Sequence, residues 1–251
     1  MKTFVGCLAA TAVAAFLAGC AEVPTDPEDR AEFEAINDPL EPTNRAIFDF
    51  NMALDRNIAK PVAKTYHEQV PEVAQKGIHN ALNNLRAPMT FINDVLQGEP
   101  DRAAQTMVRF MFNSTAGLGG LYDIVTDTNG PRYHSEDLGQ TMAVWGVGDG
   151  PYLMLPFFGP SNPRDAVGTG AEYVADPVGY VDIATWATAS KTGVGVVDER
   201  TQYLDPLDEL ERGSLDFYAA LRSVYRQRRA NDIANKDLPL SESFKAGGSK
   251  K

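Results

Sequence analysis

A mainly helical fold is predicted for this sequence, and three observations indicate it. Apolar residues recur at helical spacing in five stretches, at residues 45–58, 71–85, 88–96, 103–112 and 205–229. Proline or a helix-capping residue stands near the start of most of them. Two of the stretches, 45–58 and 103–112, are apolar around more of their circumference than a surface helix in water needs. Such helices belong either to a core or beside lipid.

The first helix of the mature chain follows an N-terminus that has the features of a secretory signal. Lys2 precedes an apolar segment at residues 4–17, which has the size of the hydrophobic region of such a signal. Leu17-Ala18-Gly19-Cys20 resembles the lipobox of bacterial lipoproteins, in which the cysteine is lipidated and becomes the new N-terminus. We therefore expect residues 1–19 to be removed as a signal peptide. A plain secretory signal cut nearby is the alternative.

Acyl chains on Cys20 would anchor the protein stably if several are attached. Ala21 follows the cysteine, and it favours the outer membrane over retention at the inner one. Residues 20–37 are acidic without an apolar period, so we interpret them as a tether. Cys7 leaves with the signal, and Cys20 carries lipid, so no thiol remains for a disulfide, a metal or catalysis. The formal net charge of −11 argues against a nucleic-acid partner.

The stretch from Trp145 to Asp165 contains the longest apolar run of the mature chain, at residues 152–158, with glycines and prolines on both sides. Seven residues cannot span a bilayer as a helix, which needs about 20. The run is either a buried strand or bend of an ordinary core, or an apolar wall beside lipid. Asn162-Pro163-Arg164-Asp165 then indicates the start of another helix.

Four local boundaries are predicted less directly. Pro88 should open a new short helix, and Ser135 should cap the helix that follows it. Residues 193–197 are typical of a turn or a short extended piece, and residues 167–189 show no assignable pattern. Asp205-Pro206 should begin the last long helix.

The end of that last helix is rich in arginine, at Arg222, Arg226, Arg228 and Arg229. Acidic residues near the start and basic residues near the end of a helix suit its dipole, so the arginines need no further role. Alternatively they contact phosphate headgroups or an acidic partner.

Catalytic and metal-binding motifs are missing from the sequence. His67, His79 and His134 are far apart, and each is expected to be a surface or satisfied residue rather than a ligand. His67-Glu68 lacks the second histidine of a zinc-protease helix, and no nucleophile elbow or phosphate loop occurs. We therefore predict no catalytic residue, no metal and no cofactor, and an enzyme is disfavoured.

Taken together, the motifs resemble those of the MlaA/VacJ-type outer-membrane lipoproteins of phospholipid trafficking. The matching segments occur in family order: Asp38-Pro39-Leu40-Glu41-Pro42-x-Asn44-Arg45, Phe48-x-Phe50-Asn51, Asn113-Ser114-Thr115-x-Gly117-x-Gly119-Gly120, Glu136-Asp137-x-Gly139-Gln140-Thr141, Trp145-Gly146-Val147-Gly148-x-Gly150-Pro151-Tyr152 and Leu155-Pro156-x-x-Gly159-Pro160-Ser161-x-x-Arg164-Asp165. Each one alone is weak, but the ordered set is specific. It indicates one domain at residues 38–235, followed by a tail at 236–251 that we expect to be disordered.

The resemblance implies a ring-like bundle of amphipathic helices in the inner, periplasmic leaflet of the outer membrane, with Gly/Pro-rich loops around a central channel. Such a lipoprotein passes mislocalised phospholipids from the outer leaflet toward a soluble periplasmic carrier, is braced by a porin trimer, and maintains lipid asymmetry. A polar path would remove the cost of moving a charged headgroup through hydrocarbon, without covalent chemistry. A non-catalytic tether to a periplasmic partner is the alternative, and a lipid hydrolase is a third.

Within this hypothesis, we assign roles to three groups of residues. The candidate channel lining is Trp145, Tyr152, Leu155, Pro156 and Phe158. A gating loop is expected at residues 122–142, with hinges at Gly117, Gly119, Gly120, Gly146 and Gly148. The candidate contacts to a partner or to headgroups are the four arginines of the last helix.

Overall fold

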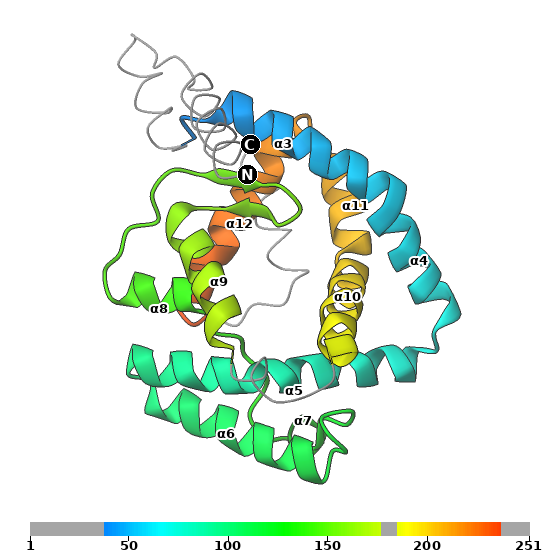
Figure 1. Ribbon diagram of the computed structural model, residues 1–251, viewed down its shortest axis with the longest axis vertical. Helices are drawn as coiled ribbons and strands as arrows, with labels where there is room; N and C mark the ends of the chain where they lie inside the picture. Colours follow the sequence, from blue (N-terminus) through cyan, green and yellow to red (C-terminus); the bar gives the residue numbers. More distant parts are fainter. Residues whose placement is uncertain (1–37, 177–184, 237–251) are drawn as a thin grey trace, which may run out of the picture. The chain divides into compact units, whose positions relative to one another are not determined.

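The computed structural model describes residues 38–176 and 185–236, which are drawn as ribbons in Figure 1. The prediction of a mainly helical fold is confirmed. The signal peptide, the lipidation of Cys20, the acidic tether and nearly all of the tail lie outside the described residues. The described chain forms two compact units, residues 38–54 with 149–163 and residues 55–148 with 164–176 and 185–236.

The described residues of the smaller unit form one helix and one hairpin. Helix α3 (Glu41–Leu54) packs against strand β1 (Leu153–Leu155), which pairs antiparallel with β2 (Gly159–Ser161). Met154 lies opposite Pro160 in this ladder. Burial alternates along the first strand, because Tyr152 and Met154 are buried while Leu153 and Leu155 are half-buried. The apolar run from 152 to 158 is thus a short strand and its turn.

In the larger unit, the regular structure of the described residues is entirely helical. A π-helix, η1 (Asp55–Ala59), leads into α4 (Lys60–Gln69), and Gly98 and Glu99 separate α5 (Glu72–Gln97) from α6 (Pro100–Thr115). These two lie side by side (Figure 1). The remaining helices are α7 (Ile124–Asp127), α8 (Leu138–Val144), α9 (Pro163–Ala175), α10 (Thr185–Gln202), α11 (Leu204–Gly213) and α12 (Phe217–Ile233).

Two predicted breaks do not occur. Pro88 lies inside α5 and opens no new helix, because buried residues on both sides of it, Asn84 and Thr90 among them, hold one continuous helix in place. Residues 193–197 belong to α10 rather than to a turn. Gly195 is buried there, and a methyl group on it would make an ordinary contact with Leu82 Cδ2 at 3.9 Å, so α10 packs against α5 at this point.

Two other boundaries differ from the prediction. The last long helix is divided into α11 and α12, because Ser214 leaves the helical conformation and the Asp216 side chain caps the new helix at Ala219 N. Helix α8 is capped by Asp137, whose carboxylate accepts from Gln140 N at 2.9 Å, and not by Ser135. The predicted start of a helix at Pro163 is confirmed as the start of α9.

Candidate functional site

The interior of the described chain is more polar than that of an ordinary globular protein. Polar or charged residues outnumber hydrophobic ones among its buried residues, whereas Asp, Glu, Arg and Asn are usually exposed. The side chains that are almost completely enclosed include Thr90, Asn93, Asp94 and Thr141. Thr141 Oγ1 donates to Asn93 Oδ1 at 2.8 Å, which joins α8 to α5. Hydrogen bonds between polar side chains therefore make many of the contacts between helices in the interior.

The exterior, conversely, carries many large apolar side chains. Several lie on the long helices α5, α6 and α9: Val73, Ile92, Val95, Leu96, Met107, Val108, Met111, Phe112, Val167, Tyr173 and Val174. No helix in the described ranges has both the length and the hydropathy needed to cross a membrane. Extensive exposed apolar surface marks a site of contact with another protein or with lipid.

The turn of the β-hairpin is the most concentrated of these apolar features. Phe157 and Phe158 are 71% and 79% exposed, and the Phe157 ring meets the half-exposed ring of Phe50 edge-on at 5.4 Å between centroids. Phe157 has a φ of +68°, which is unfavourable for a bulky side chain. Such strain persists only where neighbouring groups hold it.

Asn51 of α3 holds this turn. Its Nδ2 donates to Leu155 O and its Oδ1 accepts from Phe157 N, both at 2.9 Å. Two helical turns earlier along α3, Asn44 binds the strand in the same way. Its Nδ2 donates to Tyr152 O at 3.1 Å, and its Oδ1 accepts from Met154 N at 2.9 Å. In the part of the chain that the structure describes, β1 pairs with β2 alone. Asn44 and Asn51 therefore supply hydrogen-bond partners that a second neighbouring strand would otherwise provide.

Replacing Asn51 by alanine should lower the free energy of unfolding by about 1–3 kcal/mol, because it leaves two backbone groups unsatisfied and the strained turn unsupported. Amide hydrogen exchange at Phe157 should also become faster. Chemical unfolding and exchange measured by mass spectrometry test both effects. The control is Asp49→Ala, at an exposed position of the same helix. Unchanged exchange at Phe157 would show that Asn51 does not hold the turn.

The predicted lining residues differ in their environment. Tyr152 is buried, Leu155 is half-buried, and Pro156 and Phe158 are exposed. Trp145, at the end of α8, is 58% exposed and donates from Nε1 to Leu96 O at 2.9 Å. The side chain of Tyr152 therefore packs inside the smaller unit, and Pro156, Phe158 and Trp145 remain the surface members of the predicted group.

The predicted hinge glycines also fall into two classes. Gly117 and Gly120 are buried, and a methyl group would lie 2.3 Å from Tyr122 O at the first and 2.4 Å from Asn84 Cβ at the second. Gly119, Gly146 and Gly148 have open space around them. Close packing therefore explains why glycine is needed at Gly117 and Gly120. At Gly119, Gly146 and Gly148 no neighbouring atom obstructs a change of backbone conformation.

The loop at residues 122–142 is attached to α6 by an internal arginine. Arg109 donates to Asp123 Oδ2 at 2.7 Å and to Pro131 O at 2.6 Å, and its side chain is almost fully buried. Hydrogen bonds from Arg109, Asn113 and Thr126 outweigh burial and hold the pKa of Asp123 below its usual value. A gating movement would have to break these contacts.

A buried ionic cluster joins α8, α9 and α12. Arg229 donates to both oxygens of Asp137, at 2.6 and 2.7 Å, and to Asp165 Oδ1 at 2.9 Å. Tyr225 Oη donates to the other oxygen of Asp165 at 2.8 Å. Burial alone would raise the pKa values of both carboxyl groups, but the hydrogen bonds and charge of Arg229 lower them below the ordinary range. Burial would lower the pKa of Arg229, yet the two carboxylates raise it.

The four predicted arginines consequently have different surroundings. Arg229 is committed to this cluster, and Arg222 is buried with its guanidinium 5.4 Å from the centre of the Tyr218 ring. Arg228 lies over Tyr203, hydrogen-bonds its hydroxyl, and is 4.0 Å from Asp232. Arg226 is half-buried. Contact of these arginines with a partner or a headgroup stays a proposal. The internal contacts of Arg229 and Arg222 leave fewer of their N–H groups available for such a contact.

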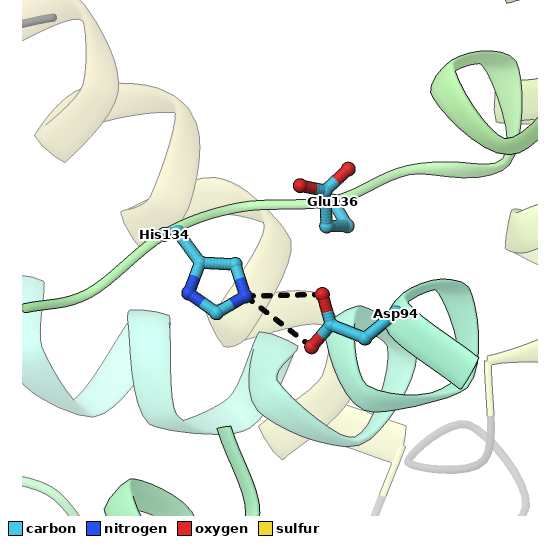
Figure 2. A group of neighbouring side chains, drawn as sticks. All are labelled: Asp94, His134 and Glu136. Carbon is cyan, nitrogen blue, oxygen red and sulfur yellow. Dashed lines mark hydrogen bonds and ion pairs between the residues drawn. The ribbon is translucent and has the colours of Figure 1, made fainter. Parts of the chain in front are cut away.

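A second buried group of charged residues was not indicated by the sequence. Figure 2 shows Asp94, near the end of α5, beside His134 and Glu136 from the segment before α8. His134 Nε2 lies 3.0 Å from Asp94 Oδ1, and Arg102 of α6 lies 2.8 Å from Glu136 Oε1. Burial raises the pKa of Glu136 despite hydrogen bonds from Gln97 and Arg102. His134-x-Glu136 was the only local signal, because Asp94 lies 40 residues away.

Comparison with known proteins identifies the family. A sequence model described as the MlaA lipoprotein family matches residues 36–232. The chain belongs to this family. It is 35% identical over 226 residues to the Intermembrane phospholipid transport system lipoprotein MlaA of Escherichia coli (strain K12), covering 87% of this chain and 84% of the relative. The lipoprotein of the same name from Haemophilus influenzae is 34% identical, covering 84% and 83%.

A solved structure described as "Structural basis for maintenance of bacterial outer membrane lipid asymmetry" superimposes with a TM-score of 0.69. It is 36% identical, and the match covers 78% of this chain and 98% of that one. Membership of the MlaA family also explains the ordered motifs in structural terms. Asn44 and Asn51 bind the hairpin, while Asp137 and Asp165 form the ionic cluster, so these motif residues hold the MlaA fold together.

This MlaA-family chain also has an apolar groove of about 560 Å³ between α4 and α10. Val62, Tyr66, Val70, Val194 and Val197 are among the residues that line it. Cavities of this size hold small ligands or parts of larger ones.

Proposed function

We propose that the chain is a lipid-anchored outer-membrane lipoprotein that passes mislocalised phospholipids from the outer leaflet toward a periplasmic carrier. The observation that carries the proposal is the reversed polarity of the molecule, with polar and charged residues buried and large apolar residues exposed. Exposed apolar helices suit the acyl region of a leaflet. Polar groups in the interior suit a headgroup, whose passage through hydrocarbon alone is costly.

The relatives support the same proposal. The proteins of E. coli and H. influenzae are named as lipoproteins of an intermembrane phospholipid transport system, and the related solved structure concerns outer-membrane lipid asymmetry. The substrate class and membrane of those proteins are the ones we propose for this chain. Transport needs no covalent step, so the proposal assigns no catalytic residue.

The finer parts of the proposal concern attachment and partners. Acyl chains on Cys20 and the exposed apolar side chains would together hold the protein in the inner leaflet. A porin trimer would brace it, and a soluble carrier would accept the lipid. Pro156, Phe158 and Trp145 are the exposed members of the proposed lipid-contact group, and Gly119, Gly146 and Gly148 are the unobstructed hinges of the proposed gate.

The groove between α4 and α10 adds a place for an acyl chain. Its lining is almost entirely apolar, apart from Thr65, the Tyr66 hydroxyl and Gln69. One hydrocarbon chain could lie there while its headgroup stays in a polar environment.

Replacing Phe158 by aspartate should raise the amount of phospholipid in the outer leaflet of cells that carry this chain as their only copy. The side chain is 79% exposed, so the charge should disturb lipid contact rather than folding. The readout is chemical labelling of outer-leaflet phospholipid in whole cells, with the abundance of the variant measured in parallel. The matched control is Gln202→Glu, which adds one negative charge at an exposed polar position at the end of α10.

Site-specific photocrosslinking tests the lipid contact directly. A photoreactive residue at Phe158 or Trp145 should yield phospholipid adducts, and one at Gln202 should not. Normal lipid asymmetry in a well-folded Phe158→Asp variant, together with no phospholipid adduct at either position, would refute the proposal. Adducts with a periplasmic protein alone would instead favour a tether between the membrane and that protein.

A further inference from the structure

The buried group in Figure 2 brings three metal-binding side chains together from two separate parts of the chain. Asp94 belongs to α5, whereas His134 and Glu136 belong to the segment that precedes α8. One donor atom from each lies within 4.8 Å of the donor atoms of the other two. Their side chains are 0%, 3% and 1% exposed, so the group is closed to bulk water.

The surroundings of His134 Nε2 are unusual for a simple hydrogen bond. Three oxygen atoms face this nitrogen: Asp94 Oδ1 at 3.0 Å, Asp94 Oδ2 at 3.2 Å and Thr106 Oγ1 at 3.2 Å. One N–H cannot serve three acceptors well. Nitrogen and oxygen ligands of one tetrahedral zinc ion, each about 2.0–2.2 Å from the metal, lie about 3.3–3.6 Å from one another. The oxygens around Nε2 are closer than this by only about 0.1–0.6 Å, so a small outward shift of the side chains would make room for an ion.

The charge of the group also calls for a cation. Asp94 and Glu136 are two carboxylates, and Arg102 is the permanent cation beside them, 2.8 Å from Glu136 Oε1 and 4.0 Å from Asp94 Oδ1. With both carboxylates ionised, the group holds one more negative than positive side-chain charge in a place without water, which is unfavourable. A divalent ion bound between the three side chains would compensate this charge.

We propose that Asp94, His134 and Glu136 form a structural binding site for one divalent transition-metal ion of the zinc class. An imidazole together with carboxylates is a donor set of Zn²⁺, whereas Ca²⁺ and Mg²⁺ prefer oxygen alone. Full burial fits a closed structural site. The ion ties the segment before α8 to α5 and, through the neighbours of its ligands, to α6.

Those neighbours form an outer layer that orients the ligands. Thr106 Oγ1 donates to Asp94 Oδ2 at 2.7 Å, and Gln97 Nε2 donates to Glu136 Oε2 at 2.9 Å. Arg102 occupies one lone pair of Glu136 Oε1 and leaves the other available, since a carboxylate oxygen accepts two contacts. Partners of this kind commonly raise metal affinity by about 10–100-fold.

The test uses the full chain, purified in detergent, stripped of metal with a chelator and then titrated with Zn²⁺. We expect one ion per chain by elemental analysis, a rise in the thermal unfolding midpoint, and a visible absorption band when Co²⁺ replaces Zn²⁺. His134→Gln should abolish all three, while His67→Gln, at an exposed position, should abolish none. Thr106→Val should weaken the affinity by roughly 10–100-fold.

Three results would overturn the proposal: no stoichiometric Zn²⁺ on the unaltered chain, equal binding by the His134→Gln variant, or equal stabilisation by Ca²⁺. The first needs no variant, so the proposal can fail even if the substitutions prevent folding. Glu136→Gln is a second ligand variant, and it should lose Zn²⁺ binding as well. Because metal content is measured without lipid, its outcome is independent of the proposed transport function.

Discussion

Replacing Arg229 by methionine is expected to lower the free energy of unfolding by about 3 kcal/mol, the lower end of the range for breaking a buried ion pair. Methionine keeps most of the apolar stem but leaves Asp137 and Asp165 close together without their shared cation. The Arg229 and Asp165 side chains are 14% and 10% exposed, so water cannot fully replace the missing guanidinium group. Asp137 is 36% exposed, so solvent screens its charge in part and the loss of stability should lie at the lower end of that range.

Arg56→Met is the matched control. Arg56 also pairs with a carboxylate, Glu211, at 2.6 Å, but the two side chains are 59% and 36% exposed. Removing an exposed pair should change stability by less than about 1 kcal/mol. Chemical unfolding of both variants in the same detergent gives the comparison. Equal losses for the two would show that the cluster around Arg229 is not a buried one.

The same cluster predicts how the loss depends on pH. In the unaltered protein, the pKa values of Asp137 and Asp165 are lowered on folding, so these groups stabilise the fold above their unfolded pKa, near 3.9. That stability is lost as the pH falls through the lowered folded values. Without Arg229, the largest contribution that lowers both pKa values is lost, so both lie higher in the folded variant than in the unaltered protein, and protonation of the two carboxyl groups on acidification relieves part of the loss in stability. The difference between the two proteins should therefore be smaller at pH 4.5 than at pH 7.

Local sequence patterns predicted the elements whose signals are local. The apolar spacing over 71–85 and 103–112 identified α5 and α6, and Asn162-Pro163 identified the start of α9. The failures lie where packing overrides a local preference. Pro88 interrupts only one helical hydrogen bond, and the buried Gly195 lies where α10 packs against Leu82 of α5, so neither residue ends its helix.

The site was less predictable because its contacts are distant in sequence. Asn51 reaches residues more than a hundred positions away, and Arg229 reaches Asp137 and Asp165 at separations of 92 and 64 residues. Helix periodicity and capping rules cannot register such pairs. The ordered motifs did contain Asp137, Arg164 and Asp165. The structure was needed to show that both aspartates bind Arg229 and that Arg164 also donates to Asp165.

Gly168 provides the second large expected effect. This glycine of α9 packs on the backbone of α8, and a methyl group built on it would lie 2.6 Å from Gly139 N and 3.0 Å from Gly139 Cα. Those atoms cannot move aside easily, because Asp137 at the start of α8 is bound to Arg229. Gly168→Ala should therefore destabilise the protein by roughly 1–3 kcal/mol, as overpacking usually does.

Gly170, two residues later in α9, has nothing within 4 Å of the same methyl position. Gly170→Ala should stabilise the protein by roughly 0.4–1 kcal/mol, because alanine reduces the conformational entropy of the unfolded chain. Both substitutions change helix propensity equally, so the difference in their unfolding free energies isolates the contact between α8 and α9. A Gly168→Ala variant as stable as Gly170→Ala would mean that these helices do not approach so closely. A large difference would show that close contact at Gly168 fixes the junction between α8 and α9, which the ion pairs of Arg229 with Asp137 and Asp165 also join.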